Sequence, residues 1–186
     1  MKEMTEKIYK KLYQDVRDFR IAFGLPTECS VSYQEAKLHN ALVSEELVEL
    51  ASAVSATDKV DALVDLAYVT MGRHVNSGDK LVLNADPILN AIVTYFKVKH
   101  IDFIKCWDEV HRSNMSKACI NIEEAELTVA KYRALGVSAG YSRVNGMYAV
   151  YCAEDCILKG VPIKRGKILK SISYKPADFS KFVLSE

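Results

Sequence analysis

The stretch LVSEELVELASAV, residues 42–54, combines the apolar content of a packed helix with three carboxylates. Its leucines, valines and alanines predict a well-buried helix, but Glu45, Glu46 and Glu49 interrupt the apolar surface. Residues three or four apart share one side of a helix, so the three carboxylates project over one arc. A solvated acidic face usually has basic partners one turn away, yet residues 38–58 contain no lysine or arginine. The cluster therefore favours a cation-binding role over an ordinary surface.

A second apolar helix with acidic side chains is predicted directly after the first. In DKVDALVDLAYVTMG, residues 58–72, Asp61 and Asp65 are four apart and share a face. Two antiparallel helices with clustered carboxylates can form a cage of oxygen ligands, which hard divalent cations such as Mg²⁺ and Mn²⁺ prefer. The two helices together therefore predict a metal site.

Apolar spacing and capping signals predict the other helices of the first 118 residues. An apolar stripe predicts a helix over residues 4–23. Three further helix starts are marked by a capping box at residues 32–35, by Asp58 as an N-cap, and by Asp86 as an N-cap followed by Pro87. The apolar period then continues to about Ala118, with a break near His100. This part of the chain is therefore predicted to be all-helical.

The character of the sequence changes after Cys119. Residues 123–136, EEAELTVAKYRALG, predict one more short helix, and Asn145-Gly146 between β-favouring segments is a strong hairpin signal. We therefore expect a helical core over residues 1–119, an αββ insert over residues 120–158, and a basic segment, residues 159–186, that completes the core domain. The predicted fold class is mainly α: a helical bundle with a small αββ insert near the C-terminus.

Composition excludes several classes of protein. The formal net charge of +1 does not suit a binder of nucleic-acid polymers or of membrane surfaces. No apolar run is long enough for a membrane helix, and the charged N-terminus lacks the apolar centre of a signal peptide. The five cysteines are odd in number and scattered, which predicts free thiols. These features predict a soluble, cytoplasmic protein.

Four sequence elements resemble those of a known superfamily. SEELVELASA (residues 44–53) followed by DALVDLAYVTMG (61–72) resembles the all-α nucleoside triphosphate pyrophosphohydrolases, the MazG and HisE group that includes dimeric dUTPases. CWDEVHRSNMSKA (106–118) is similar to phage-encoded and phosphoribosyl-ATP-pyrophosphohydrolase-like members. GKILKSISYKPADF (166–179) is similar to their C-terminal stretch. The resemblance covers most of residues 30–118 and again 166–179.

The resemblance implies cleavage of an NTP or dNTP to the monophosphate and pyrophosphate with Mg²⁺ or Mn²⁺. By position in the motifs, it implies metal ligands at Glu46, Glu49, Asp61 and Asp65. Ala62 stands where the superfamily has a glutamate, and Asp61 is the nearest substitute. Glu45, the first glutamate of the motif, is the expected general base for the attacking water.

Basic and amide donors are expected to complete the site by binding the triphosphate. The resemblance assigns this role to Arg112, Asn114, Lys117, Lys170 and Tyr174. A solvated helix end and a disordered basic tail are the alternatives for these residues. Members of the superfamily assemble with sites between subunits, so a homo-oligomer, dimer or tetramer, is also expected.

Three other functions fit the sequence. One is an enzyme selective for a single base, of the dUTP, dCTP or dGTP type, or for an alarmone nucleotide. Another is a non-catalytic nucleotide-binding protein in which Ala62 marks a lost metal ligand. The last is a helical adaptor that docks a partner through residues 120–158. A phage origin, which the resemblance suggests, would place the protein in the host cytoplasm.

Overall fold

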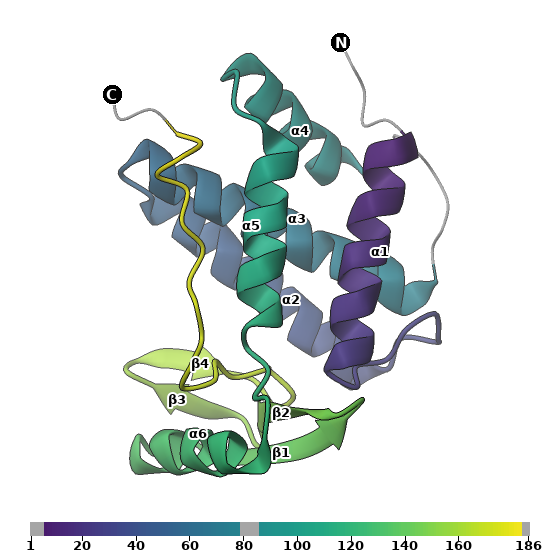
Figure 1. Ribbon diagram of the computed structural model, residues 1–186. Coiled ribbons are helices and arrows are strands. Elements are labelled where there is room, and N and C mark those ends of the chain that lie inside the picture. The colour runs from purple at the N-terminus through teal and green to yellow at the C-terminus, as the bar shows by residue number, and fades with distance from the viewer. Residues whose placement is uncertain (1–5, 79–85, 184–186) are drawn as a thin grey trace. The chain divides into compact units, whose positions relative to one another are not determined.

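The computed structural model describes residues 6–78 and 86–183, where the chain forms six helices and two small antiparallel sheets (Figure 1). The predicted mainly-α class is therefore confirmed. The chain divides into two compact units. The first comprises residues 1–18, 26–112 and 176–186, and the second comprises residues 19–25 and 113–175. None of the helices in the described residues is long and apolar enough to cross a membrane.

The first unit contains most of the helical structure. Its helices are α1 (Glu6–Ala22), α2 (Tyr33–Ser52), α3 (Ala56–Ser77), α4 (Pro87–Val98) and α5 (Phe103–Met115), of which α1 and α5 end in the second unit. Helix α3 supplies much of the core, because apolar residues occupy most of its surface. Val60, Val64 and Met71 are completely buried. The aromatic rings of Phe96, Phe103 and Trp107 pack in sequence from α4 to α5.

Helix α2 is more exposed than its sequence predicts. It packs along α3, to which it is joined by only three residues, 53–55, but none of its side chains is fully buried. Leu47 is 49% exposed and Val48 is 65% exposed. The prediction of a well-buried helix is therefore wrong for the single chain, since α2 packs on α3 by one side only among the described helices of the first unit.

The local helix signals are mostly confirmed. Ser32 caps α2 in a reciprocal capping box with Glu35, and Asp86 caps α4 by accepting hydrogen bonds from two backbone amides. His100 has a left-handed φ of 57° between α4 and α5, which is the expected break. Asp58 is not an N-cap: Ser55 caps α3, and Asp58 is its capping-box partner. The predicted start of the first helix at residue 4 lies outside the described residues.

The second unit is built around one helix and two hairpins. Helix α6 (Ile122–Ala134) packs on β1 (Ala139–Val144) and β2 (Met147–Cys152), which pair in an antiparallel hairpin. Asn145 and Gly146 both have positive φ, as the predicted tight turn requires. The second hairpin, formed by β3 (Cys156–Leu158) and β4 (Val161–Ile163), was not predicted. Its strands have only three residues each, too few to give a clear alternation.

An irregular C-terminal segment is held against α6 by side chains one turn apart. Ser173 donates to the Glu124 carboxylate, Ile172 N donates to Thr128 Oγ1 at 3.2 Å, and Lys170 N donates to Tyr132 OH at 3.1 Å. Glu124, Thr128 and Tyr132 are all buried, although each is polar. The buried polar face of α6 therefore fixes the path of residues 170–173.

Candidate active site

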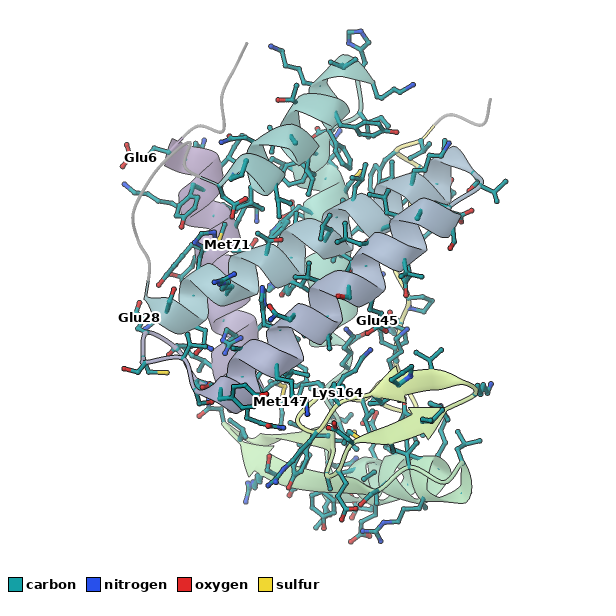
Figure 2. All side chains as sticks on the ribbon, turned by 180° about the vertical axis from the view of Figure 1, so that it is seen from behind. Glu6, Glu28, Glu45, Met71, Met147 and Lys164 are labelled. Atoms are coloured by element: carbon teal, nitrogen blue, oxygen red, sulfur yellow. The ribbon has the colours of Figure 1, made fainter. Side chains whose placement is uncertain are left out.

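The acidic residues predicted to bind a metal lie on two helices that pack against each other. Figure 2 shows Glu45 on α2 and Met71 on the neighbouring α3. Glu45 and Glu46 are half-buried, and one carboxylate oxygen of Glu46, Oε2, is shielded from solvent. Glu49, one turn further along, is exposed. The capping boxes at both helix starts fix the two helices locally, so the acidic residues stand on a regular scaffold.

Helix α3 contributes two further carboxylates. Asp61 and Asp65 are both half-buried and lie one helical turn apart. Ala62, at the position of the superfamily glutamate, is only 3% exposed. A glutamate there would bring a charge into the buried side of α3, which is costly without a partner. Asp61 is therefore the carboxylate that this helix offers instead.

The carboxylates are of the chemical type that binds a hard divalent cation. All five acidic residues offer carboxylate oxygens, which hard divalent cations prefer as ligands, and Glu46 Oε2 is shielded from solvent. Across residues 6–78 and 86–183, no three His, Cys, Asp or Glu side chains come close enough to hold a metal ion. The structure thus does not gather Glu46, Glu49, Asp61 and Asp65 around one point, and their role as ligands stays a prediction from the sequence.

A tyrosine and a histidine lie next to the acidic row of α3. Tyr68 is 5% exposed, its hydroxyl is 2.9 Å from His111 Nδ1, and its ring stacks on Trp107 with centroids 5.1 Å apart. Burial raises the pKa of Tyr68 well above its usual value, and the negative charges of Asp15 and Asp65 act in the same direction. Tyr68 therefore keeps its proton. Its hydroxyl can therefore form this hydrogen bond with either tautomer of neutral His111, as donor to Nδ1 or as acceptor from Nδ1–H.

Helix α1 places two further carboxylates near Tyr68 and His111, and the sequence analysis did not predict them. Asp15 Oδ2 accepts hydrogen bonds from Trp107 Nε1 and from Lys11, both at 2.8 Å. Asp18, one turn later, is near enough to raise the pKa of Tyr68. The available signal was Asp15 itself, a charge beside Leu12 and Val16 on the apolar stripe of α1. The sequence alone could not identify the partners of Asp15, because they come from the packing of α1 against α3 and α5.

His111 is expected to make folding stability depend on pH. Burial lowers its pKa from the usual 6.5, and Lys11 acts in the same direction, although Asp15, Asp18 and Asp108 oppose the shift. The unfolded chain therefore binds a proton first as the pH falls, so stability is lost from about pH 6.5 down through the folded-state pKa. Urea unfolding across this window is expected to show that loss, and His111→Asn is expected to flatten it.

The matched control for this prediction is His100→Asn. His100 is exposed, and asparagine tolerates its left-handed backbone. This variant is expected to keep the pH dependence of the wild type. A His111 ring that titrates above pH 6.5 in an NMR experiment would contradict the prediction.

The residues predicted to bind phosphate have other contacts in this structure. Arg112 pairs with Glu109, with 3.0 Å between Nε and Oε2, and also donates to Pro176 O at 3.0 Å. Arg112 and Pro176 both belong to the first unit, so Arg112 links α5 to the C-terminal residues of that unit. Glu109 strengthens this link by accepting from Asp178 N at 2.8 Å.

The other predicted phosphate-binding residues belong to the second unit. Asn114 is 6% exposed and its Oδ1 accepts from Lys117 Nζ at 2.6 Å. Lys170 Nζ lies 4.7 Å from the centre of the Tyr174 ring, and the Tyr174 hydroxyl accepts from Ser113 Oγ at 2.9 Å. Asn114 and Lys117 thus form one local pair at the C-terminal end of α5, and Lys170 and Tyr174 form another on the C-terminal segment.

Comparison with known proteins assigns a class to the helices that bear the acidic residues. Residues 16–91 are similar to the nucleotide pyrophosphohydrolase superfamily, so the resemblance seen in the sequence is confirmed over that segment. Within that class, the segment matches the phosphoribosyl-ATP pyrophosphohydrolase family. It includes α2 and α3 and all five acidic residues of the candidate site.

A viral protein is also similar to part of the chain. An uncharacterized protein of Acanthamoeba polyphaga mimivirus is 38% identical over 88 residues, which cover 42% of this chain and 30% of that relative. The chain thus spans less than a third of the length of the curated relative that it matches. No solved structure matches the chain.

Proposed function

We propose that this protein is a metal-dependent nucleotide pyrophosphohydrolase that converts an NTP or dNTP to the monophosphate and pyrophosphate. One observation carries the proposal: five carboxylates stand on the paired helices α2 and α3, inside the segment that matches the phosphoribosyl-ATP pyrophosphohydrolase family. A polyphosphate substrate needs its charge neutralised and a water molecule activated. A carboxylate-rich helix pair is suited to both tasks.

In this proposal Glu46, Glu49, Asp61 and Asp65 hold Mg²⁺ or Mn²⁺. When bound, the ion would neutralise phosphate charge and lower the pKa of a coordinated water. Glu45 accepts the proton of the attacking water, a role that suits its half-buried position beside the ligands. The water oxygen forms the new bond to phosphorus as the anhydride bond breaks, and the leaving phosphate takes the electron pair.

The proposed substrate contacts are the five residues that the sequence predicts to bind phosphate. Lys117 and Lys170 supply positive charge, Asn114 and Tyr174 supply hydrogen bonds, and Arg112 supplies a guanidinium that Glu109 already orients. Phosphate oxygens favour such charge-assisted hydrogen bonds. The similarity of residues 106–118 and 166–179 to superfamily motifs supports this assignment.

We further propose that the protein acts as a homo-oligomer. Helix α2 exposes Leu47 and Val48, and Val54, in the connection that follows it, is 87% exposed. A second copy would remove this apolar surface from water. Sedimentation velocity at micromolar concentration tests the proposal, and a stable monomer would contradict it.

The proposed activity is tested by measuring pyrophosphate release from each common NTP and dNTP with Mg²⁺ or Mn²⁺. We expect release that stops when a chelator removes the ion and returns when the ion is restored. The fastest substrate would distinguish a general enzyme from one selective for a single base. If no triphosphate or alarmone nucleotide is cleaved although nucleotide and metal both bind, the protein is a nucleotide-binding protein and the proposed activity is wrong.

A further inference from the structure

Two thiols of the second unit lie next to each other. Cys152 ends β2 and Cys156 begins β3, and their Sγ atoms are 3.5 Å apart. Both are free cysteines, as the sequence predicted. The three residues between them connect the first hairpin to the second. The candidate active site uses neither thiol.

The two thiols have different environments. Cys152 is completely buried, and its Sγ donates to Glu154 O at 2.9 Å. Because its only S–H is used there, the bond between the sulfurs is donated by Cys156. Burial raises the pKa of Cys152 to about 11. Cys156 is half-buried, so a reagent in solution reaches Cys156 before the fully buried Cys152, whose Sγ is 3.5 Å away.

The residues between the thiols hold the start of the C-terminal segment. The Asp155 carboxylate accepts from Lys164 Nζ at 3.0 Å and from Arg165 N at 2.9 Å. On the other side, Cys152 pairs through its backbone with Gly166 and Lys167. A change in the geometry of either cysteine is therefore expected to affect residues 164–167, which are hydrogen-bonded to Cys152 and to Asp155.

We propose that Cys152 and Cys156 are a modification site at which a low-molecular-weight disulfide forms a reversible bond between them. The Cys156 thiolate attacks the external disulfide, which forms a mixed disulfide and releases one thiolate. Cys152 then gives up its proton and attacks the Cys156 sulfur, which releases the second thiolate. The protein loses two hydrogens and the reagent becomes two thiols, so the exchange is balanced. The new bond restricts the turn that anchors residues 164–167.

The test uses the full chain carrying Cys29→Ser, because Cys29 is exposed and would react by itself. The protein is incubated with oxidised and reduced glutathione and analysed by peptide mapping. We expect a Cys152–Cys156 bond that dithiothreitol reverses. With Cys152→Ser added, glutathione is expected to remain on Cys156. With Cys156→Ser instead, Cys152 is expected to stay unmodified.

Three outcomes would overturn the proposal: no reaction at Cys156, a glutathione adduct that persists on Cys156 while Cys152 is present, or a bond to Cys106 or Cys119. Hydrogen exchange tests the consequence. The Arg165 amide, which donates to Asp155, is expected to exchange more slowly after oxidation, whereas the Val137 amide of the same unit stays unchanged. Equal rates at Arg165 in both states would refute the effect on the segment. Neither readout depends on the proposed enzymatic activity.

Discussion

Glu46→Gln is expected to lower the rate of pyrophosphate release by about 100-fold or more. Mutating a residue that only hydrogen-bonds to a metal ligand typically costs about 10–100-fold, and Glu46 is itself a proposed ligand. The substitution keeps the size of the side chain and removes one negative charge. Glu46 is the predicted metal ligand whose Oε2 is shielded from solvent. The rate is measured with the fastest nucleotide of the substrate panel at saturating metal.

The matched control is Glu126→Gln, which makes the same chemical change at an exposed position of α6. This variant is expected to keep the wild-type rate. Circular dichroism should show unchanged helix content for both. A Glu46→Gln enzyme that is correctly folded and retains full activity would remove Glu46 from the ligand set.

Trp107→Ala is expected to destabilise the protein by about 3–5 kcal/mol, the usual cost of truncating a large buried aromatic residue. Trp107 is completely buried between the rings of Tyr68 and Phe103. Its indole N–H also donates to Asp15 from across the helices, at 2.8 Å. The substitution leaves a cavity and removes one of the polar contacts between α5 and α1, while the Lys11–Asp108 ion pair stays. The loss is measured by urea unfolding.

Two variants make this measurement decisive. Trp107→Phe keeps an aromatic ring and loses the N–H, so it is expected to cost about 1–3 kcal/mol. Tyr33→Ala removes an aromatic ring that is 83% exposed and is expected to change stability by less than about 0.5 kcal/mol. A Trp107→Phe variant as unstable as Trp107→Ala would show that the hydrogen bond to Asp15, and not the packing, dominates.

The sequence predicted those elements whose signals are local. The Ser32–Glu35 capping box, the Asp86–Pro87 start and the Asn145-Gly146 turn each depend on a few adjacent residues, and all three are present. Ser55 and Asp58 show the limit of this reasoning. Both residue types favour an N-cap, and only the position at which the chain turns into α3 decides between them.

The candidate site was predictable only where its residues share a helix. Spacing along α2 and α3 identified the five carboxylates, because helical periodicity places them on common faces. Asp15, Asp18 and His111 were missed, since they meet Tyr68 through the packing of α1 and α5, at sequence separations of tens of residues. No local pattern contains that information.

The polar face of α6 also affects how this part of the protein can change over evolutionary time. Glu124, Thr128 and Tyr132 select where residues 170–173 lie, and they do so independently of how many residues connect the helix to that segment. Insertions or deletions at the β3–β4 turn therefore alter only the length of an exposed connection. Because α6 itself determines where residues 170–173 lie, the connection between α6 and this segment can vary in length while Lys170 stays in the same position.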